Sequence, residues 1–376
     1  MVILGINAIG TRHSGAAQVL LDLLEGLIKM PEIKKIKIFA SSDPIFKFPN
    51  NDKLEIIDAP PITNNLIIRF FWLQFYFKYW LNRNKCDVIY NFNNLAGKLS
   101  VPQVLFIQQS LYFSREAIKS YFISPNVPLI SRIRMVLEPF LMKVFFKISA
   151  NNCKKVIVQT ETMKEWVYNK LNIPKDKIIV ILPGSPIFFN SKKTAKRKLF
   201  KEINNNSKNW LYVGNIAPYK NLKIIYKVAK LAESENVNWK FHIVTSSKSV
   251  PWHHPLVKWY KYTNRDTLKE IYYKASALIM PSLVETIGLP MIEAMSLGIP
   301  VVAADRPYTH EICGDSTLYF HPNNSRELFE CLSKLCNNSI LRQQLINKQQ
   351  AQNKKFDQQL NVKRIWEILL NVMKNI

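Results

Sequence analysis

The stretch SALIMPSLVETIGLPMIEAMSLGIPVVAAD, residues 276–305, has the pattern of a complete strand–helix–strand unit. Two short apolar runs, 276–280 and 300–304, are typical of buried strands. Pro290 suits the first position of a helix between them, because the missing N–H of proline costs nothing there. Strands joined through a helix form parallel sheets, so this stretch predicts an α/β fold.

The same alternation extends through the whole chain. Short, β-branched apolar runs predict strands in the first half at 2–6, 35–40, 54–58, 87–91, 103–107, 155–159 and 178–182, and in the second half also at 210–214, 240–244, 258–262 and 317–320. Segments with helical periodicity lie between them. The fold class is therefore α/β, with two doubly wound and mostly parallel sheets.

Length and composition place the domain boundaries. A chain of 376 residues exceeds what one hydrophobic core usually serves, which favours two domains. The run NSKKTAKRKLFKEINNNSKN, residues 190–209, is polar and basic and is typical of an exposed connection. We expect a first domain at 1–185, a linker at 186–208, a second domain at 209–356 and a final helical segment at 357–376.

The charge balance is strongly basic. With 52 Lys and Arg against 27 Asp and Glu, the net charge is +25, which attracts nucleotide phosphates, anionic lipids or nucleic acid. The five cysteines are odd in number and scattered, which argues against a disulfide framework and a zinc site. The first residues, MVILGINAIG, lack the pattern of a signal peptide, so we expect a cytoplasmic protein.

Two carboxylates stand out in the opening stretch. Glu285 and Glu293 are eight positions apart, on either side of a Gly-Leu-Pro turn. Gly288 and Leu289 would present free amides at the positive end of the helix, which is an anion site. We expect Glu285 on the loop before the helix and Glu293 in its first turn. The alternative is that both glutamates only favour the helix start through its dipole.

These residues resemble a known family. The run ETIGLPMIEAMSLGIPVV, residues 285–302, resembles the E-x7-E signature of retaining glycosyltransferase family 4. YVGNIAPYKN at 212–221, KVIVQTETMKEWVYNKLNIPKDKIIVILPGSP at 155–186 and PYTHEICGDSTLYFHP at 307–322 are similar to further segments of that family, so the resemblance spans nearly the whole chain. It implies the GT-B fold, in which two Rossmann-like domains face each other across a cleft and segment 357–376 crosses back to the first domain.

The resemblance also implies roles for individual residues. Lys220 would contact the donor pyrophosphate, Glu285 the sugar and Glu293 the ribose, and Lys220 and Glu285 would be the catalytic pair. Gly15 and the amides of Gly288 and Leu289 would assist at the phosphates. The alternative for Lys220 is an ordinary surface lysine, and the alternative for Gly15 is a tight strand-to-helix turn.

Two positions depart from the family pattern. Asn215 replaces an arginine that would make bidentate phosphate contacts, although Asn215 stays among the expected donor-binding residues. Gln108, Gln109 and Ser110 stand where many members carry a histidine. These three side chains are candidates for binding the acceptor, or they cap the following helix. Without a histidine there is no evident general base, and the departing phosphate would take the acceptor proton.

The expected reaction is transfer of a hexosyl group, with retention, from GDP-mannose or a UDP-sugar. The acceptor would be a glycan or lipid-linked molecule in lipopolysaccharide, O-antigen or capsule synthesis. No metal or other cofactor is expected, because the histidines lack ligand spacing and no D-x-D element follows a strand. The alternatives are an inactive protein of the same fold and a basic nucleic-acid-binding protein, which lacks any supporting motif.

Peripheral contact with an anionic membrane is a further expectation. The stretches RFFWLQFYFKYWLNRNK, residues 69–85, and ISRIRMVLEPFLMKVFFK, residues 130–147, combine aromatic, apolar and basic residues. Such a composition suits a helix that lies in the membrane interface. It also suits a helix that packs its apolar side on the sheet, and amphipathic spacing alone does not separate the two.

Overall fold

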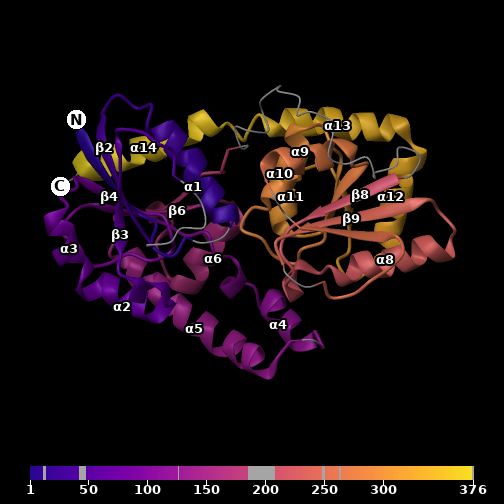
Figure 1. Cartoon of the computed structure of the whole chain (residues 1–376), viewed down its shortest axis with the longest axis horizontal. Coiled ribbons are helices and arrows are strands. Elements are labelled where there is room, and N and C mark those ends of the chain that lie inside the picture. The colour runs from indigo at the N-terminus through magenta and orange to yellow at the C-terminus, as the bar shows by residue number, and fades with distance from the viewer. Residues whose placement is uncertain are drawn as a thin grey trace. The chain divides into compact units, whose positions relative to one another are not determined.

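The computed structural model describes residues 1–11, 14–41, 48–125, 127–184, 208–247, 250–261 and 264–374. The described chain forms two compact units (Figure 1). The first unit contains residues 1–113, 133–184 and 357–374, and the second contains residues 114–132 and 208–356. Of the expected linker 186–208, all but Lys208 lies outside the described residues.

The first unit is built on a seven-stranded sheet in the order β3-β2-β1-β4-β5-β6-β7, and every strand pair is parallel. The strands are β1 Val2–Asn7, β2 Ile33–Ser41, β3 Leu54–Ala59, β4 Val88–Asn91, β5 Gln103–Phe106, β6 Lys155–Val158 and β7 Ile178–Val180. Each lies where the apolar runs predict a strand. The doubly wound α/β fold is confirmed for this unit.

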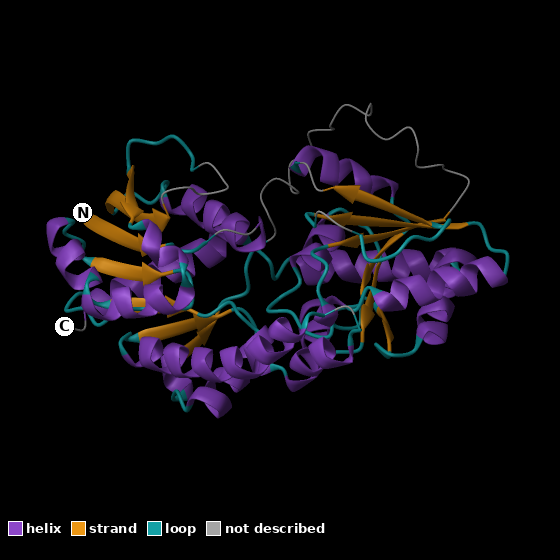
Figure 2. Cartoon of the chain, turned by 60° about the horizontal axis from the view of Figure 1, so that its bottom comes forward, coloured by secondary structure: helices purple, strands orange, loops and turns teal. Residues whose placement is uncertain are grey.

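Helices cover both faces of this sheet (Figure 2). On one face the side chains of alternate strand residues pack against α1 Ser14–Leu27 and α14 Gln358–Lys374. On the other face they pack against α2 Leu66–Phe75, α3 Phe77–Arg83, α5 Leu129–Asn151 and α6 Glu161–Leu171. Strands buried on both sides need apolar residues at every position, which explains the continuous apolar runs in the sequence.

The second unit has a six-stranded parallel sheet in the order β10-β9-β8-β11-β12-β13. Its strands are β8 Lys208–Val213, β9 Trp239–Thr245, β10 Val257–Lys261, β11 Ala277–Met280, β12 Val301–Ala304 and β13 Leu318–Phe320. Helices α8 Lys223–Ser234 and α12 Ser325–Asn337 bury apolar side chains against one face of this sheet. The other α-helices between its strands and after them are α9 Arg265–Lys274, α10 Leu289–Ser296, α11 Pro307–Cys313 and α13 Ser339–Asn353.

Segment 114–132 differs from the expected domain assignment, because it packs in the second unit although it precedes the predicted linker. Its helix α4, Arg115–Ile123, has only Ala117 buried and so lacks the apolar stripe of a core helix. It contacts the second unit through polar and ring interactions. The ring of Tyr121 lies 6.4 Å from that of Tyr219, and Glu116 pairs with Arg306.

The C-terminal helix α14 belongs to the first unit, although the helices that precede it in the sequence belong to the second. Val362, Trp366 and Leu369 of α14 are buried in the core that α1 shares with the sheet. Gly26 of α1 allows this close approach, since a Cβ atom there would lie 2.7 Å from Val362. No helix in the described part of the chain is both long and apolar enough to cross a membrane.

A buried histidine on β9 makes the stability of the second unit depend on pH. The ring nitrogens of His242 lie 3.0 Å from the Tyr260 hydroxyl and 3.0 Å from the Asn209 side-chain oxygen. Burial, and secondly the charge of Lys240, lower the pKa of His242 from 6.5 to about 4. The unfolded chain therefore binds this proton first as the pH falls.

We expect the free energy of unfolding to fall between pH 6.5 and about 4, by on the order of 3 kcal/mol from this histidine. Urea unfolding across this range should show a smaller loss in His242→Gln than in the wild type. His253→Gln, which changes an exposed histidine, is the control and should keep the full loss. An unchanged pH dependence in His242→Gln would contradict the assignment.

Candidate functional site

The strand order of the second unit determines where a ligand site lies. The chain runs outward from β8 through β9 to β10 and then returns to the centre at β11. The order therefore reverses between β8 and β11, which are paired in parallel. Open α/β sheets bind ligands at this reversal, outside the carboxyl ends of the two central strands. The two loops that leave these ends are residues 214–221 and 281–288.

An ion pair joins the two loops. Lys220 ends the short helix η4, Pro218–Lys220, after β8, and its ammonium pairs with the carboxylate of Glu285 in the loop after β11. Both side chains are 14% exposed. The Leu283 N–H also donates to the Tyr219 carbonyl at 2.8 Å, so a backbone bond supports the same connection. Two residues 65 positions apart in the sequence thus meet where the sheet order reverses.

Three tyrosines surround this carboxylate. Burial raises the pKa values of Tyr212, Tyr219 and Tyr308, and the negative charge of Glu285 raises each of them further. The Tyr308 hydroxyl donates to the Ser282 carbonyl at 2.9 Å, and the Tyr212 hydroxyl donates to the Asn215 carbonyl at 3.0 Å. Tyr212 and Tyr308 therefore support the two loops through these bonds, and none of the three phenols is available as a base near neutral pH.

The start of α10 faces the end of the same loop. Gly288 is its N-cap, with φ +75° and ψ +59°, and Pro290 is the second helical residue, one position later than expected. Within the part of the chain that the structure describes, no acceptor bonds to the N–H groups of Gly288 and Leu289. No acidic side chain stands in the first turn. The positive end of the helix is thus open to an anion.

Glu293 lies deeper than the sequence predicts. It is the fifth residue of α10, in the second turn and not in the first, and it is 9% exposed. The hydroxyl of Tyr272 on α9 donates to its carboxylate at 2.8 Å. This bond fixes one carboxylate oxygen. No motif in the sequence indicates Tyr272, because it lies 21 positions away on another helix.

Asn215, the residue in place of the family's arginine, is exposed and connects two loops. Its side-chain oxygen accepts from the Ser246 hydroxyl at 2.6 Å, in the loop after β9. Its carbonyl accepts from Tyr212. Asn215 therefore contributes to the shape of the loop after β8, while the positive charge among these site residues comes from Lys220.

The candidates in the first unit lie on separate elements. Gly15 is exposed in the first turn of α1. Gln108, after β5, donates from its side chain to the Phe92 carbonyl at 2.9 Å, and its N–H donates to Asn94 at 2.7 Å. Gln109 is half-buried, and Ser110 is buried with its carbonyl accepting from Phe113. The segment 108–110 leads into the short helix η2, Leu111–Phe113.

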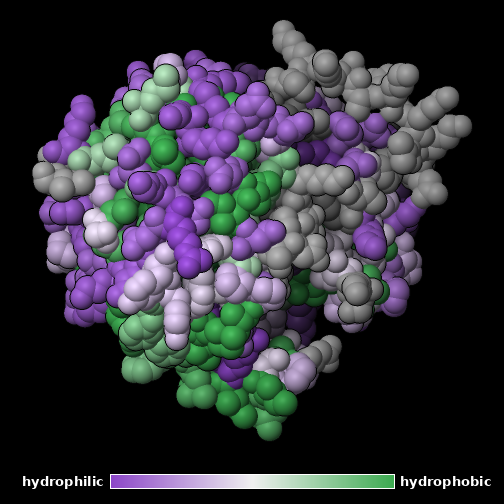
Figure 3. All heavy atoms as spheres, turned by 60° about the vertical axis from the view of Figure 1, so that its left-hand side comes forward, coloured by the Kyte–Doolittle hydropathy of each residue, from purple (hydrophilic) through white to green (hydrophobic). Residues whose placement is uncertain are grey.

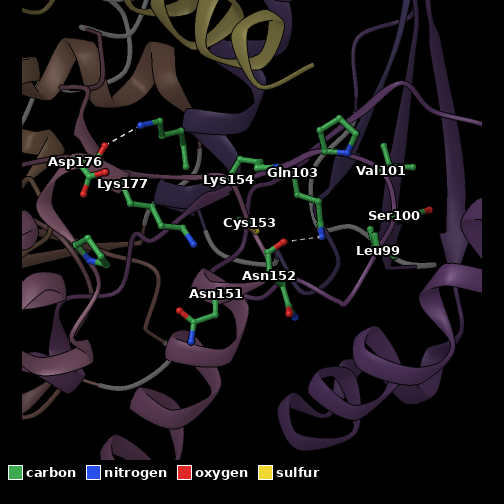
Figure 4. A pocket seen from close by; sticks show the side chains of 13 residues that line it. Leu99, Ser100, Val101, Gln103, Asn151, Asn152, Cys153, Lys154, Asp176 and Lys177 are labelled. Carbon is green, nitrogen blue, oxygen red and sulfur yellow. Dashed lines mark hydrogen bonds between the residues drawn. The ribbon is translucent and has the colours of Figure 1, made fainter. Parts of the chain in front are cut away.

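The first unit also has a pocket of about 510 Å³ (Figure 4). Gln108 follows the carboxyl end of β5, whereas the pocket lies at the other end of the strands. It lies at the amino ends of β5, β6 and β7, where Gln103, Lys155 and Lys177 are found. Burial, and to a lesser degree the nearby lysines, lower the pKa of Lys177. None of the predicted site residues lines this pocket.

The geometry at Gly288 gives a test of the α10 start. A Cβ atom there would meet Met291 at 2.7 Å and Met280 at 3.1 Å, in a left-handed backbone. We expect Gly288→Ala to lower the free energy of unfolding by roughly 2 to 4 kcal/mol, from strain and overpacking together. Gly298→Ala is the matched control, since Gly298 has φ +69° but a Cβ atom there would lie 3.9 Å from its nearest neighbour, Ile346, which is an ordinary contact. It should cost about 1 to 2 kcal/mol in urea unfolding. Equal losses would show that packing at Gly288 plays no part.

Two family models match the chain. "Glycosyl transferases group 1" matches residues 193–352, and "Glycosyltransferase Family 4" matches residues 13–186. Among curated proteins, the O-antigen chain mannosyltransferase RfbU of Salmonella typhimurium is 29% identical over 200 residues. That match covers 50% of this chain and 54% of RfbU, so the chain spans about half the length of this relative.

Solved structures match over the full length. Sucrose-phosphate synthase from Thermosynechococcus elongatus has a TM-score of 0.78 at 13% identity, over 100% of both chains. HepE from Anabaena in complex with UDP-glucose has a TM-score of 0.70 at 16% identity, over 99% of this chain and 100% of HepE. At such identities the likeness shows the fold alone. The two family models together match most of the chain, which belongs to the family 4 glycosyltransferases. The solved structures show that its fold is GT-B.

Proposed function

We propose that the protein transfers a hexosyl group from a nucleoside diphosphate sugar to a glycan or lipid-linked acceptor, with retention, in the synthesis of a surface polysaccharide such as O-antigen. The observation that carries the proposal is the Lys220–Glu285 pair at the sheet reversal of the second unit, next to the open start of α10. A cation, a carboxylate and a positive helix end suit the two halves of such a donor, an anionic pyrophosphate and a hydroxyl-rich sugar.

Each group has a proposed part in donor binding. Lys220 has three N–H donors, so it can keep Glu285 as a partner while it also bonds to pyrophosphate oxygens. The amides of Gly288 and Leu289 bind the same phosphates, and Glu285 accepts from sugar hydroxyls. Glu293, oriented by Tyr272, accepts from the ribose hydroxyls. Asn215 and Gly15 complete the proposed donor contacts.

The reaction that we propose depends on charge and not on a side-chain base. As the bond to the sugar breaks, negative charge grows on the departing pyrophosphate, where Lys220 and the start of α10 stabilise it. Positive charge grows at the sugar, beside the carboxylate of Glu285. The acceptor oxygen bonds to the sugar as the pyrophosphate leaves, and the departing phosphate takes the acceptor's proton. The tyrosines around Glu285 remain neutral and do not serve as the base. The proposal includes no metal ion and no further cofactor.

The names of two similar proteins suggest which donors to test first. RfbU is described as an O-antigen chain mannosyltransferase, which favours GDP-mannose as the first donor to test. HepE has been solved with UDP-glucose, so UDP-sugars form the second group. On the acceptor side, Gln108, Gln109 and Ser110 are the groups that we propose for hydrogen bonds to the acceptor sugar. The cytoplasmic location stays a prediction.

Donor binding by the full chain tests the proposal. Calorimetry against GDP-mannose and a panel of UDP-sugars should find one preferred donor. Lys220→Ala should weaken its binding by roughly 10- to 100-fold, because a charge-assisted hydrogen bond is lost. Lys223→Ala is the control, since Lys223 is an exposed lysine at the start of α8, and its affinity should stay within about twofold.

Two outcomes would overturn the proposal. If no nucleotide sugar binds the wild-type protein, the inactive or nucleic-acid-binding alternative gains support. If Lys220→Ala and Lys223→Ala lose the same small amount of affinity, the binding reflects the overall charge of +25 and not the proposed site.

A further inference from the structure

Helix α5 of the first unit has two apolar faces. The face toward the core contains Met135, Pro139, Met142, Phe145, Phe146, Ser149 and Ala150, all buried. A second set, Ile133, Val136, Leu137, Phe140, Val144 and Ile148, is exposed. At about 100° per residue the two sets lie on opposite sides of the helix. A helix that packs on a sheet needs only the apolar face toward the core.

Helix α2 repeats this arrangement next to α5. Phe70 and Leu73 are buried in the core, whereas Ile67, Ile68, Phe71 and Phe75 are exposed. The Phe70 ring stacks on Phe145 of α5 at 3.8 Å, and the Phe71 ring meets it edge-on at 6.2 Å. The two helices are therefore neighbours, and their exposed residues form one surface. We call these exposed residues of α2 and α5 the α2–α5 face.

The α2–α5 face is strongly exposed. Phe75 is 60% exposed, Leu137 65% and Phe140 74%. The space-filling view shows a hydrophobic area at the lower edge of the molecule, at the height of α2 and α5 in Figure 1 (Figure 3). Single exposed apolar residues are common on proteins, but a contiguous group of this kind marks an interaction site.

The charges around the face have one sign. Exposed Lys78, Arg83 and Lys85 follow α2, and Lys143 and Lys147 lie on α5. Residues 60–85 contain no Asp or Glu, and α5 contains only Glu138. That carboxylate is 14% exposed and binds Arg134 and the Tyr112 hydroxyl. The surroundings therefore attract an anionic partner.

We propose that the α2–α5 face docks on the surface of an anionic lipid bilayer. The apolar side chains enter the boundary between headgroups and acyl chains, and the lysines meet the lipid phosphates. Tyr76 and Tyr79, which are 64% and 63% exposed beside the face, suit the headgroup level. A second copy of the chain is disfavoured as the partner, because a symmetric contact would oppose the same basic residues. The inference rests on the proposed function in one respect, since a lipid-linked acceptor is found at such a surface.

Sedimentation of the full chain with vesicles tests the docking surface. The wild type should bind vesicles of phosphatidylglycerol and phosphatidylethanolamine and bind those of phosphatidylcholine alone much more weakly. Phe71→Glu with Phe140→Glu should weaken binding about tenfold or more for each phenylalanine. Ile340→Glu is the control, because Ile340 is 71% exposed on α13 of the other unit, and it should bind as the wild type does.

The basic rim is tested separately. Lys78→Gln with Lys147→Gln should weaken binding to anionic vesicles by about fivefold for each lysine. Lys223→Gln with Lys227→Gln makes the same charge change on exposed residues of α8 and should have a clearly smaller effect. Added salt should reduce the difference between the two double variants.

Three results would overturn the inference: no binding of the wild type to anionic vesicles, equal binding by the phenylalanine variant and the Ile340→Glu control, or a dimer of the wild type that only the phenylalanine variant dissociates. Donor calorimetry on the same samples separates this inference from the proposed function. The phenylalanine variant should keep the wild-type donor affinity while it loses the vesicles. Vesicle binding by a protein that binds no donor would contradict the proposed function alone.

Discussion

The ion pair between Lys220 and Glu285 is the constraint on which the rest of the site depends. Both side chains are largely removed from water, and a buried charge that loses its partner is costly. Each charge therefore requires the other, and the pair requires that the loops after β8 and β11 lie next to each other. The parallel pairing of these strands meets this requirement. The sheet order thus brings the two loops close enough for the pair to form.

The surrounding groups keep this pair in a defined state. Tyr212, Tyr219 and Tyr308 lie close enough to Glu285 for its charge to raise their pKa values, so all three remain neutral. Gly288 allows the left-handed turn that brings α10 to the end of the same loop. The site therefore combines one cation and the carboxylates of Glu285 and Glu293 with free backbone amides. Preorganised charges of this kind act without further rearrangement when charge develops in a reaction.

Much of the fold follows from local sequence patterns. Runs of four to six mostly apolar residues separated by helical periodicity predict each strand that the structure describes, because the central strands of both sheets are covered on both faces. The loop position of Glu285 and the helix start near Gly288 follow from the proline and glycine beside them. These features depend on residues that are neighbours in the sequence, so they can be predicted from local sequence patterns.

Other features depend on contacts between distant residues and could not be predicted this way. The bond between Tyr272 and Glu293 joins two helices, and segment 114–132 packs with residues far along the chain. The sequence of residues 69–85 and 130–147 is compatible both with core packing and with membrane contact. The structure shows why one pattern suits both: Phe70 faces the core while Phe71, the next residue, is exposed. Only the burial of each side chain separates the two faces.

We propose that Glu285 contacts the sugar of the donor while Lys220 contacts its pyrophosphate. The most direct measurement compares the affinity of Glu285→Gln and wild type for the free nucleoside diphosphate and for the intact nucleotide sugar. We predict that Glu285→Gln binds the nucleoside diphosphate nearly as the wild type does and loses about tenfold or more in affinity for the nucleotide sugar alone. An equal loss for both ligands, or no loss for either, would contradict the account.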